Sequence, residues 1–127
     1  MINIVQFKRD FVTRFGREPR IFRAPARVNL IGEHTDYNDG FVMPFAIENA
    51  VYVAAAARDD DRLTVASVGF PESLDVRLNA LEHTAIPDSW TRYPYGVISI
   101  VKRGGHSLHG ADLLITSDVP ALSLIHI

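Results

Sequence analysis

The stretch of this chain that decides its fold reads RAPARVNLIGEHTDY, residues 23–37. An apolar quartet at residues 28–31, with one asparagine inside it, stands directly against a polar cluster at residues 33–36. The largely apolar sequence of residues 21–31, broken by Pro25, favours an irregular strand that runs into a loop. A strand supplies a rigid base and a loop supplies side-chain variety, so this junction predicts a site for a small polar ligand.

The polar cluster offers side chains that suit hydroxyl groups. Glu33 and Asp36 each present two acceptor oxygens when ionised, and His34 donates or accepts according to its tautomer. Arg27 adds a fixed fork of N–H donors on the strand side of the cluster. Carboxylates can discriminate sugar epimers, because a misplaced hydroxyl leaves a buried acceptor unpaired at a cost of about 1–3 kcal/mol. The residues alone therefore predict a polar ligand loop, with polyols as one ligand class.

Two other interpretations of the cluster stay open at this point. Charged tetrads in loops are commonly solvated turns with no ligand. A histidine with two carboxylates also resembles a metal site, but a His-x-Asp pair without a second histidine is a weak metal signal. The chain contains no cysteine, so thiolate ligands and disulfides are excluded, and we name no metal ligand.

Hydrophobic periodicity predicts two helices. The first covers residues 2–15, with Gly16 as its C-terminal cap, and the second covers residues 92–103. Glycines at 104–105 end the second helix and do not have the loop-then-helix form of a phosphate cradle. The apolar stripe of the first helix is expected to contain Val5, Phe11, Val12 and Phe15, with Phe7 beside it, and that of the second Val97, Ile98 and Val101.

Strands are expected where apolar residues alternate or cluster between turn signals. The expected ranges are 21–31, 41–45, 50–57, 63–65, 74–78 and 111–116, with a turn at residues 38–40 and a solvated hairpin end at residues 59–61. Together, the expected helices and strands predict a mixed α+β domain with a largely antiparallel sheet and few helices.

Composition narrows the function classes. The chain is 127 residues long, 47% hydrophobic and 22% charged, with a formal net charge of −2. A mild negative balance gives no reason to expect nucleic acid or an anionic membrane as partner, because both require a concentrated basic surface. No apolar run approaches the roughly 20 residues needed to span a bilayer, and charges interrupt the N-terminus before a signal-peptide core. We expect a cytoplasmic protein.

Residues 27–37, RVNLIGEHTDY, closely resemble the galactokinase signature of the GHMP small-molecule kinase family. The resemblance continues through residues 38–44, is weaker at residues 90–97, and returns at residues 117–120. It implies the N-terminal domain of the GHMP kinase type (ribosomal protein S5 domain 2-like), here in truncated form. Residues 1–120 are then one incomplete domain.

The resemblance also implies a reaction, the transfer of the ATP γ-phosphoryl group to the 1-hydroxyl of α-D-galactose. In that reaction Glu33, His34 and Asp36 are expected to hold galactose hydroxyls. Arg27 would lie beside the reacting hydroxyl, where its charge offsets developing negative charge. Trp90 and Tyr93 resemble a region near the adenine in relatives, with a core-packing role as the alternative for each. ATP with Mg²⁺ is the implied cofactor, although no magnesium ligand can be named.

The end of the chain departs from the family pattern. After the Asp-Val-Pro of residues 118–120 the family continues into a glycine- and serine-rich phosphate loop, whereas this chain continues ALSLIHI, residues 121–127. We expect residues 121–127 to be a non-native tail, since LSLIHI matches an adaptor read through in frame, with a divergent genuine terminus as the alternative. The fragment alone is expected to be inactive. Two other functions remain open: a galactose-binding sensor without catalysis, and a sister GHMP kinase acting on another small alcohol.

Overall fold

A five-stranded sheet organises residues 2–120, the part of the chain that the computed structural model describes. Its spatial order is β1-β2-β5-β3-β4, and its members are β1 (Arg20–Asn29), β2 (Pro44–Ala57), β3 (Arg62–Ser67), β4 (Leu74–Arg77) and β5 (Ala111–Ser117). The pairs β1–β2, β2–β5 and β3–β4 are antiparallel, and β3–β5 is parallel. The expected α+β class and largely antiparallel sheet are therefore confirmed.

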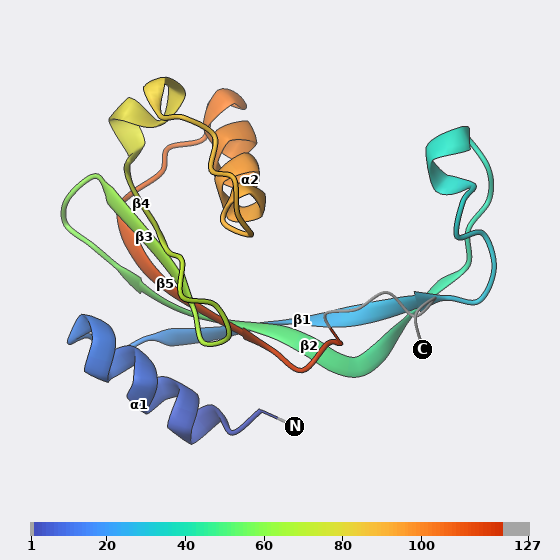
Figure 1. The fold of residues 1–127 in the computed structure, drawn as a ribbon, viewed down its shortest axis with the longest axis horizontal. Coiled ribbons are helices and arrows are strands. Elements are labelled where there is room, and N and C mark those ends of the chain that lie inside the picture. Colours follow the sequence, from blue (N-terminus) through green and yellow to red (C-terminus); the bar gives the residue numbers. More distant parts are fainter. Residues whose placement is uncertain (1, 121–127) are drawn as a thin grey trace.

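One face of the sheet is covered by helix α1 (Ile4–Phe15), as Figure 1 shows. The helix begins at Asn3, whose side chain accepts a hydrogen bond from the amide of Gln6, and ends at Gly16 with φ 67°. The cap at Gly16 was predicted correctly. The core below the helix consists of Phe7, Phe11, Ala54, Ala66 and Leu114.

The predicted stripe of α1 was wrong in part. Val5 is 62% exposed, whereas Phe7 is 2% exposed and belongs to the core. Residues four apart lie on one side of a helix, so the buried stripe runs through Phe7, Phe11 and Phe15.

The opposite face is covered by helix α2 (Arg92–Arg103) and the 3₁₀ helix η2 (Leu78–His83) (Figure 1). The bounds of α2 agree with the prediction, but Val97 is 63% exposed and does not belong to the buried side. No helix was predicted at η2, and the strand predicted at residues 74–78 ends one residue earlier, where η2 begins. The core under these helices consists of Leu63, Val65, Leu74, Val76, Leu78, Leu81 and Tyr95.

Strand β2 also differs from the prediction. Two strands were expected, at residues 41–45 and 50–57, but β2 is one strand of 14 residues and residues 41–43 lie in the preceding loop. Residues 47–49, which lie between the two expected strands, are accommodated by an irregularity in the pairing with β1. The strand therefore bends there without ending.

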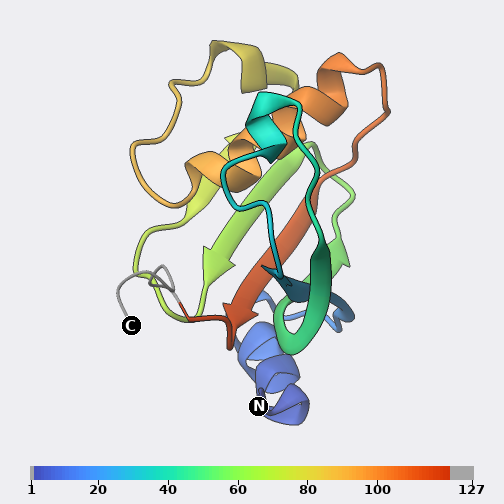
Figure 2. The same ribbon diagram turned by 90° about the vertical axis from the view of Figure 1, so that its right-hand side faces the viewer.

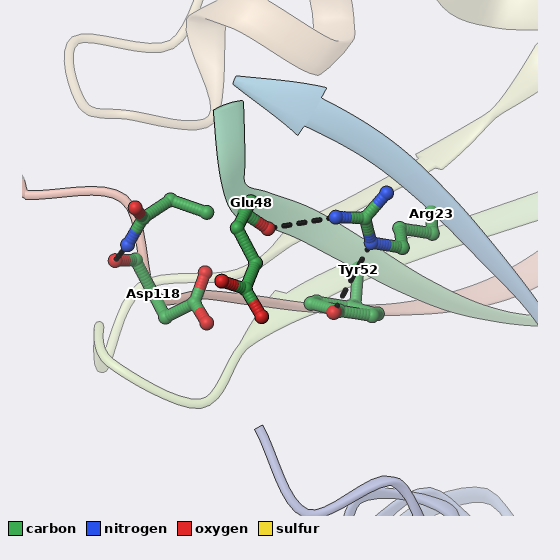
Figure 3. Close-up of a pocket in the computed structure, with 5 residues that line it drawn as sticks. Arg23, Glu48, Tyr52 and Asp118 are labelled. Carbon is green, nitrogen blue, oxygen red and sulfur yellow. Dashed lines mark hydrogen bonds between the residues drawn. The ribbon is translucent and has the colours of Figure 1, made fainter. Parts of the chain in front are cut away.

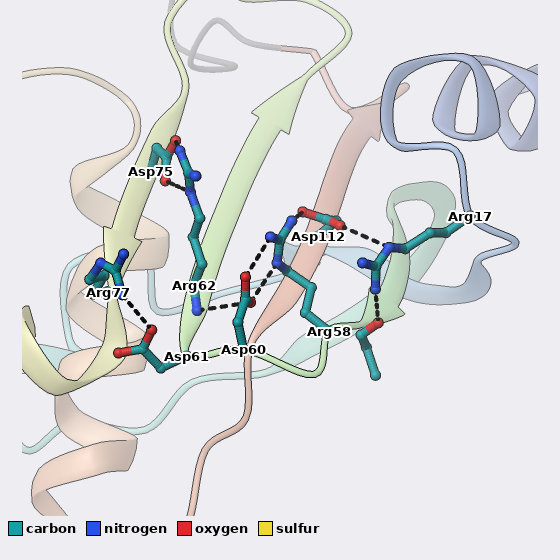
Figure 4. Close-up of polar contacts among 9 residues, drawn as sticks. Arg17, Arg58, Asp60, Asp61, Arg62, Asp75, Arg77 and Asp112 are labelled. Carbon is teal, nitrogen blue, oxygen red and sulfur yellow. Dashed lines mark hydrogen bonds and ion pairs between the residues drawn. The ribbon is translucent and has the colours of Figure 1, made fainter.

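Residues 59–61 do not form the hairpin end that was expected, because they join β2 to β3, which lie on either side of β5. Asp59 and Asp60 are exposed, as expected, and the segment takes part in an ion-pair network (Figure 4). Arg58 forms two hydrogen bonds with Asp60, at 2.7 and 2.8 Å, and one of 2.9 Å with Asp112, which is 1% exposed. The hydrogen bond from Arg58 holds the pKa of Asp60 well below its ordinary value. Arg62 lowers the pKa of Asp75 in the same way.

The network ties the sheet together, because Asp112 lies on β5 and Arg58 follows β2. Arg17, just after α1, approaches Asp112 to 3.9 Å and donates a 2.8 Å hydrogen bond to the carbonyl of Ala57. These contacts therefore connect the segment after α1, the segment after β2, and β5.

The strands β1 and β2 extend beyond the rest of the sheet. Pairing of β2 with β5 stops at Val51, whereas pairing of β1 with β2 continues to Asn29 and Pro44. The far part is thus a two-stranded ribbon, residues 27–29 with 44–46, which projects away from the helices in Figure 1. Neither helix of the described chain has the length and apolar character needed to cross a membrane. The predicted tail at residues 121–127 lies outside the described residues.

Candidate functional site

The loop at the tip of the ribbon, residues 30–43, contains the three predicted sugar-binding residues, Glu33, His34 and Asp36. It is closed at its base by two backbone hydrogen bonds, from Leu30 N–H to the carbonyl of Met43 (2.9 Å) and from Met43 N–H to the carbonyl of Ile31 (3.1 Å). A short 3₁₀ helix, η1 (Asp36–Asn38), lies at its crown. In both Figure 1 and Figure 2 the loop rises on the same side of the sheet as α2.

Thr35 braces the interior of this loop. Its hydroxyl lies 3.0 Å from the carbonyl of Gly32 and 2.9 Å from that of Phe41. Its own carbonyl accepts hydrogen bonds from the amides of Asn38 (3.0 Å) and Gly40 (2.8 Å). One side chain therefore joins the two arms of the loop, and the backbone around it closes a tight turn.

The glycines on either side of Thr35 are required by close packing. Gly32 has φ 97°, and a Cβ atom placed there would lie 2.5 Å from the carbonyl oxygen of Phe41. A Cβ atom at Gly40 would lie 2.6 Å from the Cβ of Thr35. The turn at Asp39 also takes φ 55°, a conformation that Asp tolerates better than most residues. The backbone of the loop is thus specified by its sequence.

His34 is held in orientation by Tyr37. Its Nδ1 lies 2.8 Å from the Tyr37 hydroxyl, and the two rings meet edge to face with centroids 6.1 Å apart. The side chain of Asn38 donates a 3.0 Å hydrogen bond to the carbonyl of His34. These contacts leave Nε2 of the imidazole as the ring nitrogen that can meet a ligand.

The carboxylates of Glu33 and Asp36 are exposed and make no hydrogen bond or ion pair with other groups of residues 2–120. Both lie in the same short turn as His34, on the two sides of the Thr35 brace. Two acceptor-only groups and one imidazole nitrogen are therefore offered to solvent from four consecutive positions, which suits a ligand with several hydroxyls.

The other predicted residues lie elsewhere. Arg27 is exposed on β1 at the start of the ribbon, opposite Ala46, where it makes no ion pair within the described chain. Trp90 packs against the core under α2, with its ring 5.9 Å from that of Phe70. Tyr93 lies on α2 and is 74% exposed. The structure thus places Glu33, His34 and Asp36 in one exposed turn, Arg27 on β1, and the two aromatic residues on or beside α2.

Sequence reasoning missed Thr35, which braces the loop. Hydrophobic periodicity does not single out a threonine that stands between polar residues. The role of Thr35 also depends on the carbonyl of Phe41, six positions away. The one available signal was its place in a turn beside glycine, where threonine hydroxyls commonly cap backbone groups.

The described residues offer little that would fit the phosphates of ATP or a magnesium ion. Gly104 and Gly105 close α2 and do not open a helix, so they make no phosphate cradle. Residues 2–120 contain no group of three or more histidine, cysteine or carboxylate side chains placed to hold a metal. Tyr93 has an exposed ring of the kind that can stack on an adenine, as do Tyr37 and Phe41.

Several known proteins are similar in sequence to this chain, and one family model matches the part that contains the loop. The family model described as the galactokinase galactose-binding signature matches residues 9–57, a range that contains β1, the loop and β2. The galactokinase of Chloroflexus aggregans is 49% identical over 112 residues, which make up 87% of this chain and 28% of that protein. The galactokinase of Roseiflexus is 41% identical over 94% of this chain and 30% of its own length.

A solved galactokinase structure is also similar to this chain. The crystal structure of Lactococcus lactis galactokinase complexed with galactose superposes with a TM-score of 0.83 at 32% identity, over 93% of this chain and 31% of that one. Mevalonate kinase from Methanococcus jannaschii shares the fold alone, with a TM-score of 0.64 at 18% identity over 83% of this chain and 34% of that one. The chain spans about 30% of the length of the curated relatives that it matches. Over most of its own length, the chain is similar to galactokinases.

Proposed function

We propose that residues 1–120 are the sugar-binding N-terminal domain of a galactokinase, the enzyme that phosphorylates α-D-galactose at its 1-hydroxyl with ATP. The observation that supports this most directly is the Thr35-braced loop, which presents Glu33, His34 and Asp36 to solvent within the range matched by the galactose-binding signature. The relative from Lactococcus lactis was solved with galactose.

Each loop residue has a role that its contacts permit. The carboxylates of Glu33 and Asp36 accept hydrogen bonds from sugar hydroxyls, and the imidazole of His34, oriented by Tyr37, adds a third contact. These two carboxylates have no partner among residues 2–120, so they are available for hydroxyls at fixed positions, and they penalise an epimer that leaves one of them unpaired.

Arg27 is proposed as the catalytic residue of this part of the protein. It lies on a strand and not in the loop, so its position is fixed by the backbone pairing with Ala46. A guanidinium beside the reacting hydroxyl would offset the negative charge that develops in phosphoryl transfer. Trp90 and Tyr93 are proposed near the adenine, Tyr93 through its exposed ring. Magnesium, as the usual companion of ATP, and a cytoplasmic location belong to the same proposal.

The loop can be tested by titrating the ¹⁵N-labelled chain with galactose and with its 4-epimer glucose, with amide chemical shifts as the readout. We expect galactose to shift the amides of residues 30–43 and glucose to have a weaker effect. Glu33→Ala and Asp36→Asn should abolish most of the response, whereas Glu82→Ala, on η2, is the matched control. Shifts spread over α1 and β4 and absent from the loop would contradict the assignment.

Phosphorylation is tested in a galactokinase-length protein that contains residues 1–120. Formation of galactose 1-phosphate that is lost in Arg27→Ala supports the kinase. Galactose binding with no phosphorylation in the parent protein would favour the sensor, and a response to another small alcohol in place of galactose would favour a sister kinase.

A further inference from the structure

Strand β2 contains a bulge at the level where the ribbon leaves the sheet. Pro25 pairs with Ala50 and Arg27 pairs with Ala46, so residues 47–49 of β2 face the single residue Ala26 of β1. The last pair between β2 and β5, Val51 with Ser117, lies just beyond the same level. Three paired strands therefore become two at the bulge.

The direction of the ribbon depends on this bulge. Bulges bend a strand and increase its twist, and a two-stranded ribbon has little packing of its own to resist a change of angle. Side chains along the ribbon are mostly exposed, and Phe45 is 49% exposed. Whatever fixes the bulge therefore fixes the place of the loop at the far end.

Arg23 ties the bulge to the body from the β1 side. Its Nη2 donates a 2.7 Å hydrogen bond to the carbonyl of Glu48, in the middle of the bulge, and its Nε donates one of 3.3 Å to the hydroxyl of Tyr52 (Figure 3). The guanidinium also lies over the ring of Tyr52, 5.9 Å from its centroid, and Tyr52 packs against the core under α1. A hydrogen bond from a charged donor is stronger than a neutral one, which suits a fixing contact.

Asn49 ties the bulge to the segment that follows β5. Its side-chain amide donates a 2.8 Å hydrogen bond to the carbonyl of Asp118. The adjacent Ala50, which is 0% exposed, donates its backbone N–H to the carboxylate of Asp118, also at 2.8 Å. Arg23, Glu48, Asn49, Tyr52 and Asp118 line an open hollow of about 370 Å³ at this point.

We propose that Arg23 and Asn49 are positioning residues that fix the angle between the ribbon and the sheet, and through it the place of Glu33, His34 and Asp36 relative to α2. Both lie at the base of the ribbon and act on the loop through the backbone of β2. The part of the proposal that concerns a sugar rests on the proposed function, whereas the part that concerns the angle does not.

The angle can be measured directly, because the chain has no cysteine of its own and introduced cysteines label uniquely. Spin labels on Phe41→Cys in the loop, where the parent side chain is 98% exposed, and on Arg103→Cys at the end of α2 report the distance between the two regions. We expect Arg23→Ala and Asn49→Ala to shift and broaden the distance distribution. Arg23→Lys keeps one donor for the carbonyl of Glu48 and should restore much of the parent distribution.

The control is Arg62→Ala, which removes an exposed ion pair with Asp75 in another part of the sheet. It should leave the distribution unchanged. Circular dichroism identifies any variant that fails to fold. If Arg23→Ala does not fold, the distance distributions of Asn49→Ala and Arg23→Lys test the proposal. An unchanged distribution in both Arg23→Ala and Asn49→Ala would overturn the proposal.

A galactose titration of the same variants tests the consequence for the ligand. We expect the Kd of Arg23→Ala to rise roughly tenfold, the effect of losing one charged hydrogen bond that holds the loop in place. A shifted distance with an unchanged Kd would overturn the link to the ligand. If the parent chain does not bind galactose, the proposed function fails while the distance measurement still decides the role of the two residues.

Discussion

The body of the molecule and the ribbon with its loop are stabilised in different ways. In the body, side chains such as Phe11 and Val65 are 0% exposed and lie between the sheet and its helices. In the loop, Phe41 is 98% and Leu30 is 71% exposed, and hydrogen bonds around Thr35 hold the backbone. The comparison teaches that a substitution in the body should change global stability, whereas one in the loop should change local shape and ligand binding.

The largest effect is expected from a matched pair of phenylalanines. Phe11→Ala should lower the free energy of unfolding by about 3–5 kcal/mol, because it removes a buried ring and leaves a cavity. Phe41→Ala should change it by no more than about 0.5 kcal/mol, because that ring is almost fully exposed. Urea denaturation measures both. Equal losses in the two variants would remove the distinction between body and loop.

A buried ion pair should rank next. Asp112→Ala should lower the free energy of unfolding, because Asp112 is 1% exposed and its loss leaves Arg58 paired only with the exposed Asp60 among the described residues. Asp75→Ala removes an exposed carboxylate from its pair with Arg62 and should change stability little. Thermal melting of the two variants at neutral pH compares them, and a smaller loss for Asp112→Ala than for Asp75→Ala would contradict the network in Figure 4.

A substitution at Gly32, in the loop, distinguishes a change in local loop structure from a change in global stability. Gly32→Ala should distort the loop, because φ 97° is unfavourable for alanine and the new Cβ would meet the carbonyl oxygen of Phe41. We expect amide shifts to change over residues 30–43 and galactose binding to be lost, with the melting temperature nearly unchanged. Gly69→Ala, where a Cβ meets nothing within 4 Å, is the control. A large drop in melting temperature for Gly32→Ala alone would show that the loop supports the body.

The smallest effect is expected in the dependence of stability on pH under acidic conditions. Hydrogen bonds from Arg58 and Arg62 lower the pKa values of Asp60 and Asp75 in the folded state. Their contribution to stability is therefore fully present above the ordinary aspartate pKa of 3.8 and is lost as pH falls toward the lowered values. Asp75→Asn should flatten the dependence of stability on pH below about 4. Parallel curves for the variant and the parent would contradict the prediction, and high salt should shrink the difference.

The elements that local sequence specifies were predicted well. The range of α2, the glycine cap of α1 and the strand at residues 111–116 follow from periodicity and turn residues, which act over a few positions. The loop residues were named from the resemblance of RVNLIGEHTDY to a specific family signature, and their roles stay a prediction.

The features that were missed depend on distant partners. The continuity of β2 rests on a bulge that Arg23 holds from 25 residues away and Asp118 from 69. The network at residues 59–61 depends on Asp112, whose partner Arg58 lies 54 residues earlier. Local patterns do not contain such pairings, because they arise only when the strands take their order in the sheet.

The place of β5 has a consequence for how the chain folds during synthesis. This strand is the last of the five along the chain, yet it lies between β2 and β3 and contributes to the cores on both faces. Before residues 111–117 leave the ribosome, the nascent chain can form two separate hairpins, β1–β2 and β3–β4, but no common sheet. Each hairpin then has an open edge that another chain could pair with.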